Sequence, residues 1–197
     1  MPRPPLVSDE ELIDRLSTLF RNAGYEGASM ARVAEVTGLG KSSLYHRFPG
    51  GKQQMAEEVT RHLQRTFADR VLSPATRLDL SVTVRLRRIA ANLRSFYGAG
   101  MSACLLETLT VETISTRTSE GIARAAGAWT DTFAALSREA GIAPREAIAR
   151  AQDAIARIEG ALVLARATGD TRAFERALRS LPVALTGATT DDTRSKQ

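Results

Sequence analysis

The segment that most constrains the fold is residues 29–52, SMARVAEVTGLGKSSLYHRFPGGK, whose pattern predicts two short helices joined by a glycine turn. Ala34 is small enough for two helices to approach closely, and Gly38, four residues later, can take the positive φ that a sharp turn requires. Leu39 and Leu44 then supply apolar side chains that bury the turn and the second helix. This spacing is typical of a helix-turn-helix, which presents its second helix to DNA.

The caps and faces of the two helices follow from the same segment. Ser29 is the expected N-cap of the first helix and Gly40 that of the second. Leu44 and Phe48, four residues apart, are expected to turn inward together. The side chains expected to face solvent are rich in hydrogen-bond donors: Lys41, Ser42, Ser43, Tyr45 and His46. Such donors can contact both phosphates and base edges.

The sequence LYHRF, followed shortly by a lysine, resembles the tetracycline-repressor (TetR) family of dimeric transcriptional regulators. The resemblance extends over about residues 8–60 and implies a family-type DNA-binding domain over about residues 6–66. It also implies three small N-terminal helices for DNA and about six more for ligand binding and dimerisation. The ending FPGGK resembles a subgroup that includes regulators of multidrug export.

The resemblance also implies a role for each polar residue of the segment. The residues implied to bind phosphates are Tyr45, His46 and Lys52. Those implied to approach base edges in the major groove are Lys41, Ser42 and Ser43. Ser29 would bring the amide end of its helix toward the DNA backbone, and Arg32 is a further backbone candidate. The alternative is that Tyr45 and His46 are ordinary surface residues of a small helical domain.

The rest of the chain shows helical periodicity and no convincing strand alternation, so we predict an all-α protein of about nine helices. Besides the two helices of the turn, these are expected near residues 8–24, 52–72, 78–97, 103–114, 119–140, 144–168 and 171–181. In the helix at 78–97, Arg85, Arg87 and Arg88 are expected to face outward. The predicted domains are residues 1–52 for DNA binding and 53–188 for ligand binding and dimerisation, with a disordered tail at 189–197.

Composition narrows the class of protein. The formal net charge of +5 and a pI near 10.0 favour a polyanionic partner. Residues 1–52, however, hold 7 basic and 6 acidic residues, so charge alone does not locate the DNA-binding end. One cysteine excludes an intrachain disulfide, and no signal peptide or membrane-spanning stretch is evident, so we expect a cytoplasmic protein without a membrane partner.

Neither catalysis nor a cofactor is indicated. GLGKSS at 38–43 lacks the glycine that a phosphate-binding loop places five residues before Gly40, where Glu35 stands. The two histidines, His46 and His62, and the single Cys104 show no metal-ligand spacing, and no serine lies in a nucleophile-elbow motif. We therefore expect no enzyme activity, no metal and no cofactor.

The C-terminal helices offer candidates for a small-molecule pocket, which needs an apolar lining and a few polar groups. These candidates are Phe96, Tyr97, Met101, Cys104, Glu107, Trp129, Phe133 and Glu159. Amphipathic spacing explains the same residues as helical core, and both interpretations stay open at this stage.

The helix at 144–168 carries a face of small residues that permits close helix approach: Ala147, Ala151, Ala154, Ile158 and Ala161. The resemblance implies that the last two helices pair with their copies as a four-helix bundle. The candidates for that interface are Ala151, Ile155, Ile158, Leu162, Phe174 and Leu178. An intrachain core accounts for these residues equally well.

These observations predict a ligand-responsive transcriptional regulator, a homodimeric repressor that a small-molecule inducer releases from double-stranded operator DNA. The alternative is a helical small-molecule-binding protein with weak or lost DNA binding. Affinity for duplex DNA that falls with rising salt distinguishes the two.

Overall fold

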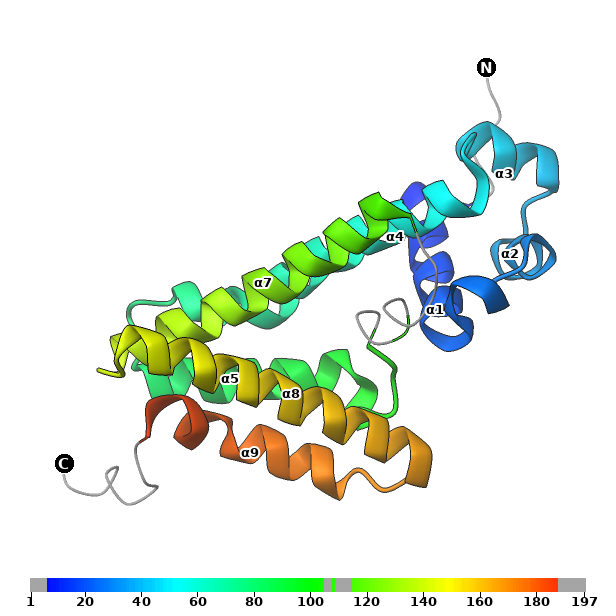
Figure 1. Cartoon of the computed structure of the whole chain (residues 1–197). Coiled ribbons are helices and arrows are strands. Elements are labelled where there is room, and N and C mark those ends of the chain that lie inside the picture. Colours follow the sequence, from blue (N-terminus) through cyan, green and yellow to red (C-terminus); the bar gives the residue numbers. More distant parts are fainter. Residues whose placement is uncertain (1–6, 105–107, 109–114, 188–197) are drawn as a thin grey trace. The chain divides into compact units, whose positions relative to one another are not determined.

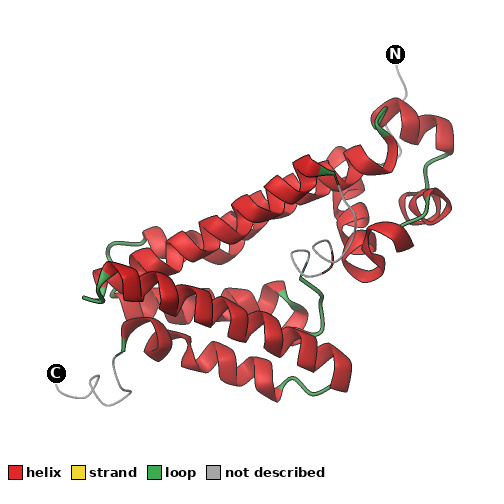
Figure 2. Ribbon diagram, in the orientation of Figure 1, coloured by secondary structure: helices red, strands yellow, loops and turns green. Residues whose placement is uncertain are grey.

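The computed structural model describes residues 7–104, 108 and 115–187. These residues are helical with no strand among them (Figure 2), which confirms the predicted all-α class. The α-helices of this part, labelled as in Figure 1, are α1 (Asp9–Gly27), α2 (Met30–Thr37), α3 (Lys41–Arg47), α4 (Gly51–Phe67), α5 (Val82–Phe96), α7 (Thr116–Glu139), α8 (Pro144–Thr168) and α9 (Arg172–Thr186). Most of the helix expected at 103–114, and the tail at 189–197, lie outside the described residues.

Several helix boundaries differ from the prediction: α1 continues past Gly24, where its backbone is kinked, to Gly27, α4 ends at Phe67, and α7 begins at Thr116. Two further differences have a clear local reason. α5 begins at Val82 and not near Leu78, because the Ser81 hydroxyl accepts the Val84 amide at 3.4 Å and caps the helix there. α9 continues past Leu181 to Thr186, since Leu185 is fully buried and extends the apolar stripe by one more turn.

The chain forms two compact units. The first unit comprises residues 1–65 and 104–124, and its core collects apolar side chains from α1 to α4 and from the start of α7. The fully or almost fully buried residues of this core include Leu12, Leu16, Phe20, Val33, Leu44, Phe48, Met55, Val59 and Ile122. The two helices of the predicted turn are therefore held by a core to which α1 and α4 also contribute.

The second unit comprises residues 66–103 and 125–197, and in it α9 packs against α8 and α5 (Figure 1). The predicted small-residue face of α8 is buried, with exposed fractions from 0% at Ala147 to 6% at Ala161. Because alanine side chains are short, this face lets a neighbouring helix approach closely.

Arg85 corrects the prediction of an outward arginine face on α5. Arg87 and Arg88 are exposed, but the Arg85 side chain is only 1% exposed. Its guanidinium donates to the Ala75 carbonyl at 2.9 Å and forms an ion pair with Glu139. Arg85 shares the buried face of α5 with Leu86 and Ile89, and a charged residue is tolerated there because both partners are present.

Candidate nucleic-acid interface

The turn between α2 and α3 has the geometry that the sequence predicts. Gly38 ends α2 in the left-handed region, with φ 70° and ψ 13°, and its amide donates to the Ala34 carbonyl at 2.9 Å. The buried Thr37 hydroxyl donates to the Val33 carbonyl at 2.7 Å and accepts the Leu39 amide at 3.3 Å. Backbone groups at the turn are thus satisfied by short local bonds that fix where α3 begins.

The second helix of the turn, α3, has only seven residues, too few to be stable in isolation. Its position depends on Leu44 and Phe48, both 0% exposed in the core of the first unit. Gly40 is its N-cap, as predicted, and supplies no side-chain hydrogen bond there. Tertiary packing, with little contribution from helix propensity, therefore holds α3.

The outer face of α3 carries the predicted donors. Lys41, Ser42, Ser43, Tyr45 and His46 are all exposed, and Tyr45 keeps 50% of its surface accessible. No side-chain hydrogen bond or ion pair joins these five residues to any other residue that the structure describes. The face is consequently available to an external acceptor such as a phosphate or a base edge.

Ser29 is the N-cap of α2, as predicted: its hydroxyl accepts a hydrogen bond from the Arg32 amide at 3.3 Å. The Arg32 side chain is exposed, and its guanidinium donates to the Gly27 carbonyl at 3.0 Å. At the other end of α2, Arg15 of α1 donates to the carbonyls of Val36 and Thr37 at 3.3 and 3.2 Å. No local pattern predicts these two bonds, because they join residues more than twenty positions apart.

Lys52 is more strongly engaged within the chain than the other predicted phosphate contacts. Its ammonium donates to the Tyr25 carbonyl at 2.9 Å, lies 4.2 Å from the centre of the Tyr25 ring and is 3.8 Å from the Glu26 carboxylate. The side chain is 22% exposed. Burial, and then the charges of Glu26 and Glu57, raise the pKa of Tyr25 above its usual value. Lys52 thus joins the start of α4 to the end of α1.

The two glycines of the FPGGK ending have different roles. Gly51 begins α4 with φ 60°, a value that favours glycine, and its amide donates to the Phe48 carbonyl at 2.8 Å. Gly50 donates its amide to the Gln54 side chain at 2.9 Å. The neighbouring Arg47, which the sequence did not single out, forms an ion pair with Asp9 at 2.9 Å.

Four of the predicted pocket residues gather in the second unit around Phe67. The Phe67 ring lies 4.9 Å from Trp129 and 5.4 Å from Phe96, measured between centroids. Phe96 contacts Tyr97 at 5.2 Å, and Trp129 contacts Phe133 at 5.9 Å. We call these five side chains the aromatic cluster. The indole nitrogen of Trp129 is buried and has no hydrogen-bond partner among the described residues.

The other predicted pocket residues are placed differently. Met101 faces solvent with 53% of its surface exposed, whereas Cys104 is 4% exposed and belongs to the first unit. Glu159 is half-buried on α8, and Glu107 lies outside the described residues.

The predicted dimer residues pack within the chain. Ala151, Ile158, Leu162, Phe174 and Leu178 are buried in the second unit, and Ile155 is half-buried. The apolar side chains that α8 and α9 leave exposed are others: Ile148, Val163, Leu164 and Val183. Periodicity identified the buried face correctly but did not distinguish it from an exposed apolar face on the same helices.

Two further observations concern the described part of the chain only. No three His, Cys, Asp or Glu side chains gather there as metal ligands. None of its helices combines the length and hydropathy needed to cross a membrane.

Residues 12–59 match the family model of bacterial regulatory proteins of the tetR family, and residues 85–180 match the C-terminal domain of LmrA/YxaF-like transcriptional regulators. The uncharacterized HTH-type transcriptional regulator YxaF of Bacillus subtilis (strain 168) is 25% identical over 183 residues, which are 89% of this chain and 94% of YxaF. The HTH-type transcriptional regulator LmrA of the same strain matches locally, with 31% identity over 64 residues, or 32% of this chain and 34% of LmrA.

Solved structures share the fold. A TetR transcriptional regulator from Legionella pneumophila superimposes with a TM-score of 0.82 at 16% identity, covering 92% of this chain and 99% of that one. AibR, solved in complex with isovaleryl coenzyme A and operator DNA, gives a TM-score of 0.69 at 18% identity and covers 91% of this chain and 98% of AibR. The finer FPGGK subgroup stays a prediction. The two family models and the helix-turn-helix geometry establish that the chain belongs to the TetR family of DNA-binding transcriptional regulators and is not an enzyme.

Proposed function

We propose that this regulator is a homodimeric repressor that releases its operator when a small molecule binds in its second unit. The observation that carries the proposal is the outer face of α3, where five exposed donor side chains have no partner among the described residues. Two copies of such a helix would enter successive major grooves about one helical turn apart, ~34–36 Å. A repressor of this kind would act in the cytoplasm, where bacterial operators lie.

Each polar residue of the first unit has a proposed contact. Lys41, Ser42 and Ser43 would reach base edges, because they lie in the first turn of the recognition helix. Tyr45, His46 and the start of α2 with Ser29 and Arg32 would hold phosphates. Lys52 would contribute a phosphate contact only through the ammonium N–H donors that do not bind the Tyr25 carbonyl.

The DNA contacts can be tested by fluorescence anisotropy with the protein's own upstream region and with a random duplex. We expect Lys41→Ala to weaken binding to the upstream region by about 1–3 kcal/mol and to reduce the preference over the random duplex. Arg87→Ala is the matched control, since it removes one exposed positive charge from α5, outside the first unit. Equal affinities for the Lys41→Ala variant and the wild type would reject the assignment of α3 as the reading helix.

The exposed apolar residues of α8 and α9 support the homodimer. Leu164 keeps 55% of its surface exposed, and Ile148, Val163 and Val183 between 37% and 43%. We expect a second copy of the same two helices to cover part of this exposed apolar surface, as in a symmetric dimer. We expect Leu164→Glu to shift the protein to monomer in analytical ultracentrifugation. Leu78→Glu, at a leucine that is 82% exposed in the segment before α5, should leave the dimer intact.

The aromatic cluster supports the ligand site. A buried indole N–H without a partner is costly, and a ligand that carries an acceptor would satisfy it. Trp129 is the chain's only tryptophan, so binding next to it would change the intrinsic fluorescence directly. The related AibR structure was solved with isovaleryl coenzyme A, which makes that compound a reasonable first probe. A small molecule that lowers DNA affinity but does not alter Trp129 fluorescence would place the inducer elsewhere.

A further inference from the structure

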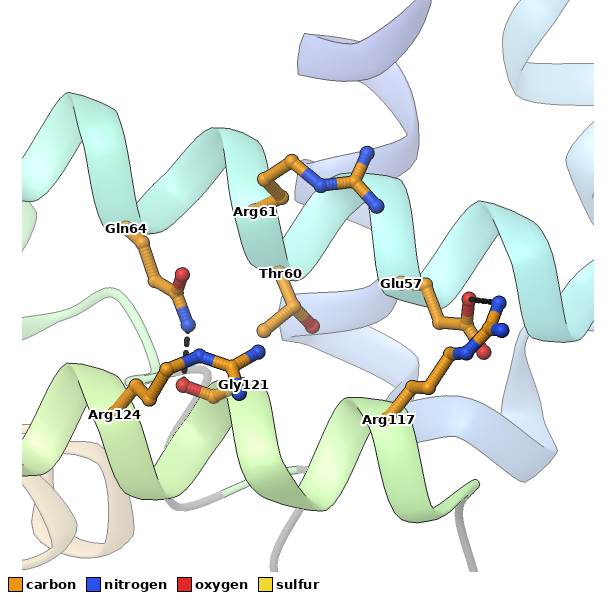
Figure 3. Close-up of a pocket in the computed structure, with 7 residues that line it drawn as sticks. All are labelled: Glu57, Thr60, Arg61, Gln64, Arg117, Gly121 and Arg124. Atoms are coloured by element: carbon orange, nitrogen blue, oxygen red, sulfur yellow. Dashed lines mark hydrogen bonds and ion pairs between the residues drawn. The ribbon is translucent and has the colours of Figure 1, made fainter.

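A polar groove lies between α4 and the first turns of α7, within the first unit (Figure 3). Its volume is about 290 Å³. The residues that line this α4–α7 groove are Glu57, Thr60, Arg61 and Gln64 from α4 and Arg117, Gly121 and Arg124 from α7. Neither the helix-turn-helix nor the aromatic cluster includes any of them.

Gly121 determines how closely the two helices approach at the groove. A Cβ atom there would lie 3.1 Å from the Thr60 methyl and 3.3 Å from the Gln64 side-chain nitrogen, closer than most such contacts. The Gln64 amide donates to the Gly121 carbonyl, as Figure 3 shows, and the Thr60 hydroxyl donates to the Ala56 carbonyl at 2.8 Å. These bonds fix the floor of the groove and leave the arginines as its adjustable side chains.

The lining carries three arginines and one carboxylate. Glu57, 13% exposed, accepts the Ser115 hydroxyl at 3.0 Å and lies 3.9 Å from the Arg117 guanidinium, so its charge offsets that of one arginine. Arg124 pairs only loosely with Glu120, at 3.7 Å with both side chains well exposed. Arg61 forms no ion pair within 4 Å to any residue that the structure describes. The groove therefore retains positive charge on α4 and on α7.

We propose that the α4–α7 groove binds a small oxyanion, a molecule carrying a phosphate or carboxylate group, between Arg61 and Arg124. A guanidinium presents a planar fork of N–H donors that matches the oxygens of such groups. A volume of about 290 Å³ accommodates a small anion, and the polar lining does not suit an apolar drug-like molecule. The inference goes beyond the proposed inducer site, because it concerns the first unit and does not require DNA.

The site can be tested by isothermal titration of the full chain with pyrophosphate and, separately, with succinate, at constant ionic strength set with chloride. We expect one anion per chain and an affinity that falls about tenfold in Arg61→Gln and in Arg124→Gln. Arg65→Gln is the matched control, because it removes an exposed charge from the same helix outside the groove. Preference for one probe identifies phosphate or carboxylate as the group that the groove favours.

Glu57→Gln provides a test of opposite sign. It removes the carboxylate that opposes an incoming anion and retains an oxygen that can accept the Ser115 hydroxyl, so binding should tighten. Circular dichroism verifies that each variant is folded, and the anion should raise the melting temperature of the wild type by an amount that grows with the logarithm of its concentration above Kd. Absence of binding at concentrations that fill a millimolar site, or an equal loss in Arg61→Gln and Arg65→Gln, would overturn the proposal.

Discussion

Gly38 turns the chain between α2 and α3 with φ 70° and ψ 13°, in the region where an L side chain is strained. Nothing lies within 4 Å of the place that its Cβ would occupy, so the requirement for glycine there comes from the backbone and not from packing. Gly40, two residues later, is extended at φ −68° and ψ 156°, a conformation open to any residue. The backbone conformation thus favours glycine at position 38 but not at position 40.

We expect Gly38→Ala to lower the free energy of unfolding by about 1 kcal/mol, because alanine must adopt the left-handed conformation. Gly127→Ala on α7 is the matched control, since its Cβ would also meet nothing within 4 Å while its backbone is helical. It should raise the free energy of unfolding by about 0.5–1 kcal/mol. Urea titration followed by circular dichroism measures both, and effects of the same sign would contradict the backbone explanation.

At the scale of elements, single polar side chains hold helices that the apolar stripes only bring near each other. Lys52 joins α4 to the end of α1 through the Tyr25 carbonyl, 27 residues away. Arg85 joins α5 to Ala75 and to Glu139 at the end of α7, which are 10 and 54 residues away. Such contacts cannot be derived from helical periodicity, because they depend on which elements meet.

For Lys52 we expect both a stability and a binding effect. Lys52→Met keeps the apolar stem but removes the bond to the Tyr25 carbonyl and the contact with the ring, and should cost about 1–2 kcal/mol of stability. Lys41→Met, on an exposed side chain without an internal partner, should leave the melting temperature unchanged. If Lys52 also contacts a phosphate, its loss reduces the salt slope of DNA binding by about 1. Thermal melting and anisotropy at several salt concentrations separate the two roles.

For Arg85 we expect a purely structural effect. Arg85→Met approximately conserves volume but leaves the Ala75 carbonyl without its donor, so the free energy of unfolding should fall by about 1–3 kcal/mol. Glu139 is 48% exposed and can be hydrated after the ion pair is lost, which limits the penalty. Arg88→Met is the matched control, because Arg88 lies on the same helix but is exposed. Its free energy of unfolding, measured by urea titration, should stay within about 0.5 kcal/mol of the wild type.

At the scale of the whole molecule, the sequence predicted best what is decided locally. The cap at Ser29 and the turn at Gly38 were predictable because each depends on the backbone of a few consecutive residues. The division of apolar residues between core, pocket and interface was not, since Leu162 inside the chain and Leu164 on its surface differ only by their direction on one helix. Assigning such residues requires the neighbouring elements, which no period in the sequence specifies.

The dimer proposal makes a prediction about DNA length that involves the whole assembly. If two α3 helices read one operator, affinity requires half-sites about 10–10.5 bp apart, so that both face the same side of the duplex. Inserting about 5 bp between them turns one half-site to the opposite side, and anisotropy should then report the weak affinity of a single half-site. The Leu164→Glu variant, expected to be monomeric, should bind both operators with that same weak affinity. A wild type that binds the two operators equally would show that each chain reads DNA independently, whatever contacts α3 makes.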